Sequence, residues 1–199
     1  VAEYICADQD QAILYGKDLE LQLRELERLF YGLNFTREIT PRLRDVICSY
    51  GERLSAELLS FGLNAQNVFA RYCLPHKIGL LTDGKYGDAT ALISKSSRIL
   101  PGQITPLLKD NKIVFIPGFY GVSEQEEITT FGRGGSDYSA AVIAVILGAE
   151  VLEIWKDVAG YMSADPCFVP EARLIEKLSY EEAAELSDFG AKILHPRTM

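Results

Sequence analysis

The stretch TTFGRGGSDYSAAVIAVILGAEVLEIWKDVAG, residues 129–160, decides the fold expected of this chain. Its apolar segment 136–147 predicts a buried helix that ends at Gly148. Directly before that helix stands a loop that combines glycines with an Arg, a Ser and an Asp. The apolar segment 149–155 predicts a buried strand, and a charged Lys-Asp pair follows it at once. A glycine-rich loop, a helix and a strand in immediate succession indicate an α/β domain.

Two amphipathic helices are predicted nearer the amino terminus. Residues 17–31 repeat leucines on one face and place Glu and Arg on the other. Residues 41–61 hold a second apolar stripe. Thr40 is the expected N-cap of this second helix, and a proline suits its first position. Gly62 is the expected end.

Further strands and a further helix complete the expected pattern. Residues 77–84, KIGLLTDG, predict a short buried strand and a turn, and residues 113–116 predict a strand that breaks at a Pro-Gly pair. A helix over residues 179–190 should begin with a capping box of Ser179 and Glu182. Nearly continuous apolar strands that alternate with helices predict an α/β fold, an αβα sandwich around a mainly parallel sheet.

Composition narrows the class of partner. The chain has 199 residues, a net charge of −8 and a pI of about 4.9. An acidic chain is not expected to bind nucleic acid, because that binding relies on a surplus of Lys and Arg. No apolar run is long enough for a membrane helix, and the acidic start does not resemble a signal peptide. Four scattered cysteines favour free thiols in a reducing cytoplasm. These are Cys6, Cys48, Cys73 and Cys167.

Three loops at predicted strand ends are candidates for a ligand site, because ligands of parallel sheets bind at the carboxyl ends of strands. They are residues 117–120, the glycine-rich loop, and residues 156–160. Arg133 offers a planar fork for a carboxylate or phosphate, and Asp137 offers an acceptor for an ammonium group. The two could hold both ends of an amino acid. The alternative is an ordinary helix start, capped by Ser136 or Asp137, with a solvated Arg.

Several other polar residues are ambiguous from pattern alone. Asp157 follows a predicted strand, where a loop can hold a nucleotide base and ribose, or it belongs to a plain turn. Lys192 would ordinarily be a surface group, and His195 would ordinarily have a structural role. Glu52 would ordinarily be an exposed charge that pairs with Arg53 or Arg44. Neither a Walker loop nor a dinucleotide-binding glycine motif occurs in the sequence.

In order and spacing, five motifs together resemble the kinase domain of aspartate kinase, a member of the amino acid kinase superfamily. They are GERLSAELL, IPGFYG, ITTFGRGGSDYSAA, WKDVAGYMSADP and LSYEEAAELSDFGAKILHPRT. The similarity runs from about residue 42 to residue 199 and is densest from residue 129 onward. It implies ATP-dependent phosphorylation of the side-chain carboxylate of L-aspartate to 4-phospho-L-aspartate. That reaction is the first step toward lysine, threonine and methionine.

The resemblance also implies roles for particular residues. Arg133 would bind a substrate carboxylate, and Asp137 would lie near the substrate ammonium group. Glu52, Gly135 and Ser136 would line the same pocket. The nucleotide side would comprise Lys156, Asp157, Met162, Cys167 and Lys192. Asp137 and Lys192 would act most directly in catalysis. ATP and Mg²⁺ would be required, with Mg²⁺ bridging the phosphates, and family members are typically homo-oligomers.

Three departures from the family pattern temper these expectations. The opening KFGGTS strand-loop of the family is absent, and the regulatory domains that normally follow HPRT are absent too. The chain is therefore expected to be a kinase-domain fragment with poor activity by itself. Lys156 also stands where the family has Thr, and Cys167 stands where it has Arg. The second change puts ATP affinity in doubt, although Lys156 could compensate in part.

Other functions stay open on the sequence. Another kinase of the same superfamily could act on glutamate, acetylglutamate, carbamate or UMP. A degenerate module that binds a ligand or a partner without catalysis is a second alternative. A dehydrogenase is less well supported, since the chain has no dinucleotide motif, although some family members carry a dehydrogenase domain downstream.

Overall fold

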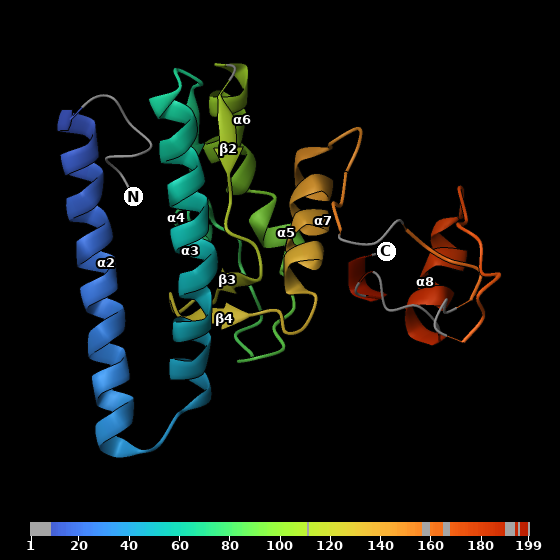
Figure 1. Cartoon of the computed structure of the whole chain (residues 1–199), viewed down its shortest axis with the longest axis horizontal. Helices are drawn as coiled ribbons and strands as arrows, with labels where there is room; N and C mark the ends of the chain where they lie inside the picture. Colours follow the sequence, from blue (N-terminus) through green and yellow to red (C-terminus); the bar gives the residue numbers. More distant parts are fainter. Residues whose placement is uncertain are drawn as a thin grey trace.

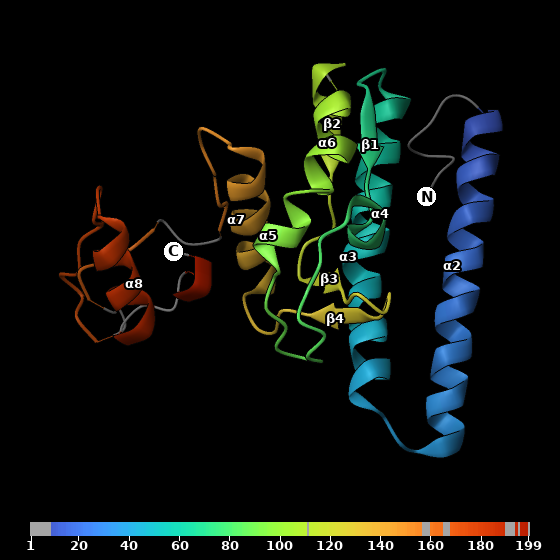
Figure 2. The same ribbon diagram turned by 180° about the vertical axis from the view of Figure 1, so that it is seen from behind.

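The computed structural model describes residues 9–110, 112–156, 160–164, 168–189, 194 and 196–198. Two long helices, α2 (Gln9–Thr36) and α3 (Pro41–Ala65), lie side by side at one flank of the molecule (Figures 1 and 2). The strands lie between α3 on one side and helices α6 (Leu100–Lys109) and α7 (Gly135–Leu147) on the other. This order of helix, strand and helix layers is the expected αβα arrangement.

The helix pair forms because both helices bury matching faces. The ring of Tyr15 on α2 stacks on that of Phe61 on α3, with ring centroids 4.1 Å apart. The Tyr50 hydroxyl donates to the Glu25 carboxylate at 3.2 Å. Packing beyond the predicted segment 17–31 explains why α2 is longer than its leucine repeat suggested, since tertiary contacts supply most helix stability.

The start of α3 confirms the sequence analysis, and its end corrects it. The Thr40 hydroxyl accepts a hydrogen bond from the amide of Leu43 at 3.2 Å, as an N-cap should. The helix does not stop at Gly62 but continues to Ala65. The extra turn brings in Asn64, whose side-chain amide makes two hydrogen bonds with the backbone of Ala70, at 2.8 and 3.2 Å. These bonds offset the modest cost of a glycine inside a helix.

The parallel part of the sheet is a pair of short strands. Strand β1 (Ala70–Tyr72) pairs in parallel with β2 (Ile113–Phe115), which confirms the predicted strand at 113–116. The buried strand expected over residues 77–84 is confirmed only in part, since Leu81 bridges in parallel to Val122 and residues 77–78 are helical. Pro75 starts the short helix α4 (Pro75–Ile78), because proline suits a first helical turn. The extended backbone that follows makes isolated bridges rather than a ladder.

A hairpin that the sequence analysis did not predict follows the loop after β2. Strand β3 (Tyr120–Val122) pairs antiparallel with β4 (Ile128–Thr130). The turn between them is closed by Ser123, whose amide donates to the Glu127 carbonyl at 2.8 Å. Its hydroxyl also accepts from two amides of the turn, at 3.2 Å each. This acidic segment contains no apolar pattern, so the sequence analysis did not predict the turn.

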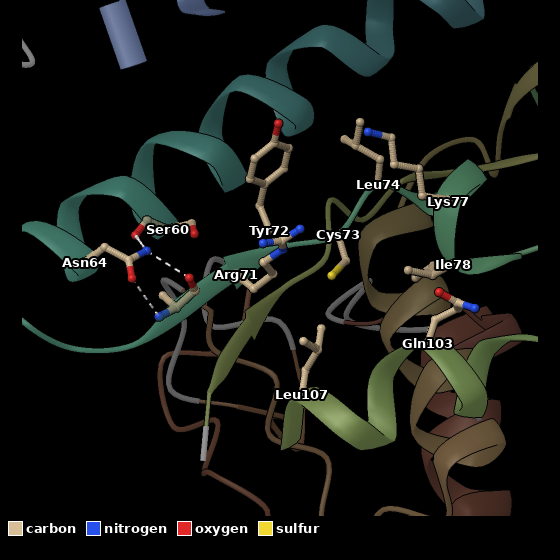
Figure 3. A pocket seen from close by; sticks show the side chains of 11 residues that line it. Ser60, Asn64, Arg71, Tyr72, Cys73, Leu74, Lys77, Ile78, Gln103 and Leu107 are labelled. Carbon is tan, nitrogen blue, oxygen red and sulfur yellow. Dashed lines mark hydrogen bonds between the residues drawn. The ribbon is translucent and has the colours of Figure 1, made fainter. Parts of the chain in front are cut away.

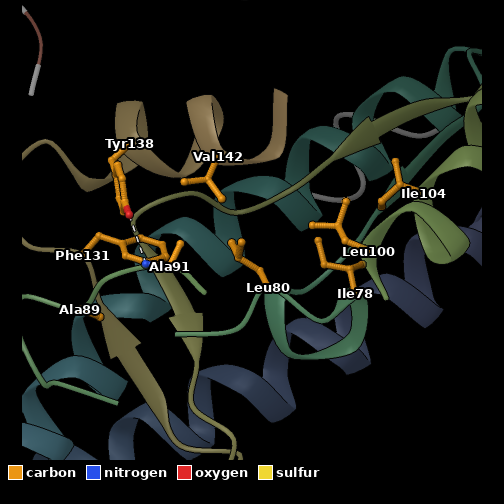
Figure 4. Packing of buried hydrophobic residues seen from close by; sticks show 9 residues of the cluster. All are labelled: Ile78, Leu80, Ala89, Ala91, Leu100, Ile104, Phe131, Tyr138 and Val142. Carbon is orange, nitrogen blue, oxygen red and sulfur yellow. Dashed lines mark hydrogen bonds between the residues drawn. The ribbon is translucent and has the colours of Figure 1, made fainter. Parts of the chain in front are cut away.

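The main apolar cluster lies between the hairpin and the helices of the far layer (Figure 4). The short helix α5 (Ile93–Ser96) also contacts α7. The rings of Phe131 and Tyr138 meet edge to face at 5.2 Å, and the Tyr138 hydroxyl accepts a hydrogen bond from the Ala91 amide at 3.2 Å. The members of the cluster are Ile78, Leu80, Ala89, Ala91, Leu100, Ile104, Phe131, Tyr138 and Val142.

The region after α7 departs from expectation in one element. Helix α7 ends with Gly148 in the left-handed conformation, as predicted. The strand predicted over residues 149–155 does not form, because none of the described strands lies beside it to share a ladder. Val151 and Trp155 are consequently 71% and 87% exposed. A strand needs a hydrogen-bonded neighbour as well as an apolar sequence.

The carboxyl-terminal part contains helix α8 (Tyr180–Phe189) and the 3-10 helix η1 (Pro196–Thr198). The predicted capping box is confirmed. The Ser179 amide donates to the Glu182 carboxylate at 2.8 Å, and the Glu182 amide donates to the Ser179 hydroxyl at 3.2 Å. Within the described ranges, no helix combines the length and apolar character needed to cross a membrane.

Candidate active site

The glycine-rich loop enters α7 through Gly134, which is the N-cap residue and has φ +74°. The helix begins at Gly135, one residue earlier than expected. The predicted capping by Ser136 or Asp137 is therefore wrong: no side chain caps this helix start. A left-handed N-cap is a conformation that glycine adopts without strain. Asp137, in the first turn of α7, is thus left to bind something other than its own backbone.

The loop after β2 packs directly on this helix start. Phe119 has φ +73°, a rare backbone conformation for a residue with a side chain. Its amide donates to the Ser139 hydroxyl at 3.2 Å, and its carbonyl accepts from the Phe131 amide at 2.8 Å. A Cβ atom on Gly135 would lie 2.9 Å from the Phe131 side chain and 3.2 Å from the Phe119 carbonyl. Glycine at 135 is what allows the two loops to approach this closely.

The third strand-end loop reaches the same place through an ion pair. The Lys156 ammonium lies 2.7 Å from the Asp137 carboxylate. The two side chains are 30% and 12% exposed, respectively. Arg133 and Ser136 are exposed beside them. The loop after β2, the glycine-rich loop and Lys156 of the third predicted loop therefore meet at the amino-terminal end of α7.

Helix α3 is fastened to the strand that leads into this site. The Asp45 carboxylate, 1% exposed, accepts hydrogen bonds from the amides of Gly87 and Thr130 at 2.8 Å each. It also accepts from the Thr130 hydroxyl at 3.0 Å. Helical spacing puts Ser49 and Glu52 on the same face of α3 as Asp45. Glu52 is half-buried there. Its ordinary interpretation, an exposed charge, is therefore not met.

The charge of Glu52 acts on Tyr120 of β3. Burial raises the pKa of the Tyr120 phenol, and the Glu52 carboxylate raises it further, while Arg53 opposes both. The phenol is fully buried, and its hydroxyl has no hydrogen-bond partner among the described residues. Tyr120 therefore stays neutral in the interior of the protein.

The nucleotide-side predictions are only partly covered by the structure. Met162 is half-buried and forms an isolated bridge with Leu174. Asp157, Cys167 and Lys192 lie outside the described residues, as does His195. The structure thus brings Lys156 to Asp137, which Arg133 and Ser136 neighbour in sequence, and leaves the remaining nucleotide-side residues as predictions.

A sequence model of the amino acid kinase family matches residues 8–199. The chain belongs to the amino acid kinase family. Its sequence is 40% identical over 155 residues to an aspartokinase of Thermus thermophilus, covering 78% of this chain and 37% of that protein. It is 36% identical over 183 residues to a bifunctional aspartokinase/homoserine dehydrogenase of Buchnera aphidicola, covering 92% of this chain and 22% of that protein.

A solved structure of an amino acid kinase family member shares the fold. E. coli aspartokinase III in complex with aspartate and ADP superposes with a TM-score of 0.84 and 34% sequence identity. The match covers 92% of this chain and 40% of that one. This chain therefore spans well under half of the length of the aspartokinases to which it is similar.

The sequence analysis missed the structural importance of two residues of this chain, Asp45 and Arg197. Asp45 was given no role in the sequence analysis, yet it is the most deeply buried carboxylate among the described residues. Arg197 was quoted within a motif and given no role, yet its guanidinium makes an ion pair with Asp88 at 2.7 Å. No local pattern marked either residue, because their hydrogen-bond partners lie far away in the chain.

One cavity lies away from the loops around α7. It measures about 590 Å³ and is bounded by β1, the end of α3 and α6 (Figure 3). None of the predicted site residues lines it. Its polar lining includes Asn64, Arg71, Lys77 and Gln103. The candidate site around the start of α7 is therefore chosen by its loops and charges and not by cavity size.

Proposed function

We propose that the loops around the start of α7 form the acceptor side of an aspartate kinase. The protein would transfer the γ-phosphoryl group of ATP to the side-chain carboxylate of L-aspartate, giving 4-phospho-L-aspartate. We call residues 132–137 the acceptor loop. In this proposal, Arg133 binds the substrate α-carboxylate and Asp137 binds its ammonium group. Glu52, Gly135 and Ser136 line the pocket.

The observation that carries the proposal is the contact between Lys156 and Asp137. The Asp137 carboxylate already holds an alkylammonium group at 2.7 Å, in a half-sheltered position. It therefore has the geometry to hold the ammonium group of an amino acid. Arg133 stands four residues earlier, is exposed, and carries the planar fork that matches a carboxylate. A cation and an anion at that spacing complement a small zwitterion.

The chemistry needs little from a general base. The aspartate side chain is already ionised at neutral pH, so its oxygen can attack the γ-phosphorus as it is. The new bond is an oxygen–phosphorus bond to the carboxylate, the bond from the γ-phosphorus to the bridging oxygen breaks, and ADP leaves. Positioning and screening of negative charge carry such a reaction. Asp137 orients the acceptor, and Lys192 is proposed to meet the phosphates.

Magnesium would be held mainly by the nucleotide. Among the described residues, no group of three or more His, Cys, Asp or Glu side chains could form a metal cage. This fits Mg²⁺, which commonly binds through substrate phosphates, water and one or two carboxylates. When bound, the ion would neutralise charge on the β- and γ-phosphates. Asp157 of this chain is the carboxylate proposed to stand nearest to the nucleotide.

The remaining nucleotide-side proposals concern residues near the ends of the site. Met162 would provide an apolar contact, and Cys167 would stand at the position where the family has Arg. Lys156, next to Asp157 in sequence, would supply part of the missing positive charge. We further propose a homo-oligomer and a reducing compartment, the cytoplasm, in accord with the scattered cysteines. Relatives named as chloroplastic leave an organelle as the alternative outcome of a localisation experiment.

The deciding experiment measures acceptor specificity in the protein that carries these residues. ADP release from Mg-ATP should require L-aspartate, and hydroxylamine should trap the acyl phosphate as a hydroxamate. Glutamate, acetylglutamate, carbamate and UMP should give at most about a hundredth of that rate, since a polar site rejects ligands that leave its groups unpaired. Turnover that prefers another acceptor contradicts the proposal. Calorimetry that detects neither Mg-ATP nor aspartate binding would favour a non-catalytic module instead.

The ion pair itself gives a prediction for Lys156→Met. Removing the ammonium group frees Asp137, so the KM for aspartate should fall about threefold to tenfold. The same change should raise the KM for ATP about tenfold, because a charged contact contributes about 1.5–3 kcal/mol. Initial rates at varied aspartate and varied ATP measure the two constants separately.

A matched control for this prediction is Lys177→Met. Lys177 is an exposed lysine on the segment before α8, so both constants should stay within about twofold of wild type, as for most surface changes. A rise in the aspartate KM of Lys156→Met would show that the ammonium group assists the acceptor rather than competing with it. In that case Lys156 and the substrate ammonium group would not compete for Asp137.

A further inference from the structure

Arg197 of η1 touches both ends of the acceptor loop. Its Nη2 donates to the Phe131 carbonyl at 2.9 Å and to the Asp88 carboxylate at 2.7 Å. Its Nη1 donates to the Ala89 carbonyl at 3.1 Å. The guanidinium carbon lies 4.9 Å from the centre of the Tyr138 ring. Nη1 also lies 3.5 Å from the Thr90 hydroxyl. One side chain thus contacts three separate parts of the chain: residues 88–90, Phe131 and Tyr138.

Two contacts of Arg197 fall on the residues that flank the acceptor loop in the chain. Phe131 is the residue immediately before the acceptor loop, and Tyr138 is the residue immediately after it. The guanidinium therefore contacts the residues on either side of the loop. Between those points the loop contains glycines with positive φ, so its own backbone does little to fix its shape.

The two end residues are joined to a third segment through the same group. The Tyr138 hydroxyl accepts from the Ala91 amide, and the Arg197 guanidinium bonds to Ala89 and Asp88 two and three residues earlier. Segment 88–91 is thereby a fixed support on which both ends of the loop rest. A planar guanidinium can serve several acceptors in one plane and stack on a ring at the same time, and an ammonium group cannot.

We infer that Arg197 is a positioning residue for the phosphoryl acceptor. By holding Phe131 and Tyr138 at a set separation, it fixes where Arg133 and Asp137 meet the substrate. The identity of the substrate in this inference rests on the proposed function. The mechanical part, that Arg197 holds the acceptor loop in place, does not depend on it.

The first test measures the loop directly. Amide hydrogen exchange of a peptide spanning residues 130–138 should become about tenfold faster in Arg197→Gln, because local opening sets exchange rates. Exchange in α3 should stay as in wild type. Arg197→Lys, which keeps the charge and stem, should give an intermediate rate. Unchanged exchange at 130–138, or faster exchange across the whole chain, overturns the inference.

Asp88→Asn is the matched control. It weakens the ion pair of Arg197 but leaves the Phe131 carbonyl contact in place, and the Asp88 side chain is 80% exposed. Exchange at 130–138 should then change less than about twofold, since exposed ion pairs contribute little. An effect equal to that of Arg197→Gln would mean that Arg197 acts through the ion pair and not on the loop, which also overturns the inference.

The second test measures the consequence for the acceptor. Arg197→Gln should raise the KM for aspartate about tenfold and leave the KM for ATP within about twofold, as expected when a small displacement affects one substrate. Arg197→Lys should restore part of the loss. Faster loop exchange with an unchanged aspartate KM rejects the positioning role. If wild type does not phosphorylate aspartate, the exchange experiment still decides the mechanical part, and the proposed function fails separately.

Discussion

Replacing Arg133 with Gln is expected to raise the KM for L-aspartate about 100-fold. The substitution removes a planar, charge-assisted pair with the substrate carboxylate, which contributes about 1.5–3 kcal/mol, and each 1.4 kcal/mol is about tenfold. The KM for ATP should change less than about twofold. Because Arg133 is exposed, the melting temperature should stay close to that of wild type.

Two further variants sharpen this prediction. Arg133→Lys keeps the charge and loses the fork, so the aspartate KM should rise about tenfold, between wild type and Arg133→Gln. Arg98→Gln removes an exposed arginine after α5 and should leave both constants unchanged. An aspartate KM for Arg133→Gln that equals the wild-type value would mean that the substrate carboxylate binds elsewhere.

Replacing Asp45 with Ala should lower the free energy of unfolding by about 3–5 kcal/mol. The change leaves three buried donors without an acceptor: the amides of Gly87 and Thr130 and the Thr130 hydroxyl. Losing one partner of a buried charged network has a cost of that size. Asp45→Asn should cost somewhat less, since one amide oxygen can still accept. Urea unfolding followed by circular dichroism measures the difference.

The control for Asp45→Ala removes an exposed carboxylate instead of a buried one. Asp110 is exposed and pairs with Lys112 at 3.2 Å on the surface. Asp110→Ala should change the free energy of unfolding by less than about 1 kcal/mol, as surface ion pairs usually do. If Asp45→Ala were as mild as Asp110→Ala, the docking of α3 on β4 would not depend on this carboxylate. The position of Glu52 relative to the acceptor loop would then need another explanation.

The candidate site could be read from sequence to the extent that one local segment contains it. Arg133, Ser136 and Asp137 lie within a few residues of one another and of the helix start, so glycine and helix signals were enough to find them. The resemblance to aspartate kinase added Glu52 and the nucleotide-side residues. Asp45 and Arg197 escaped, because their partners are far away in the chain and neither belongs to a local pattern.

The sequence by itself determined helices α3, α7 and α8, the caps at Thr40 and Ser179, and the αβα class, because hydrophobic period and capping chemistry act over a few residues. It did not determine which apolar segments become strands. Residues 70–72 form a ladder and residues 149–155 do not, since a ladder depends on a neighbour that only the folded chain supplies. The tertiary structure likewise decided that Lys156 meets Asp137 and that Arg197 contacts both ends of the acceptor loop. Those contacts join distant segments, and long-range packing alone brings such segments together.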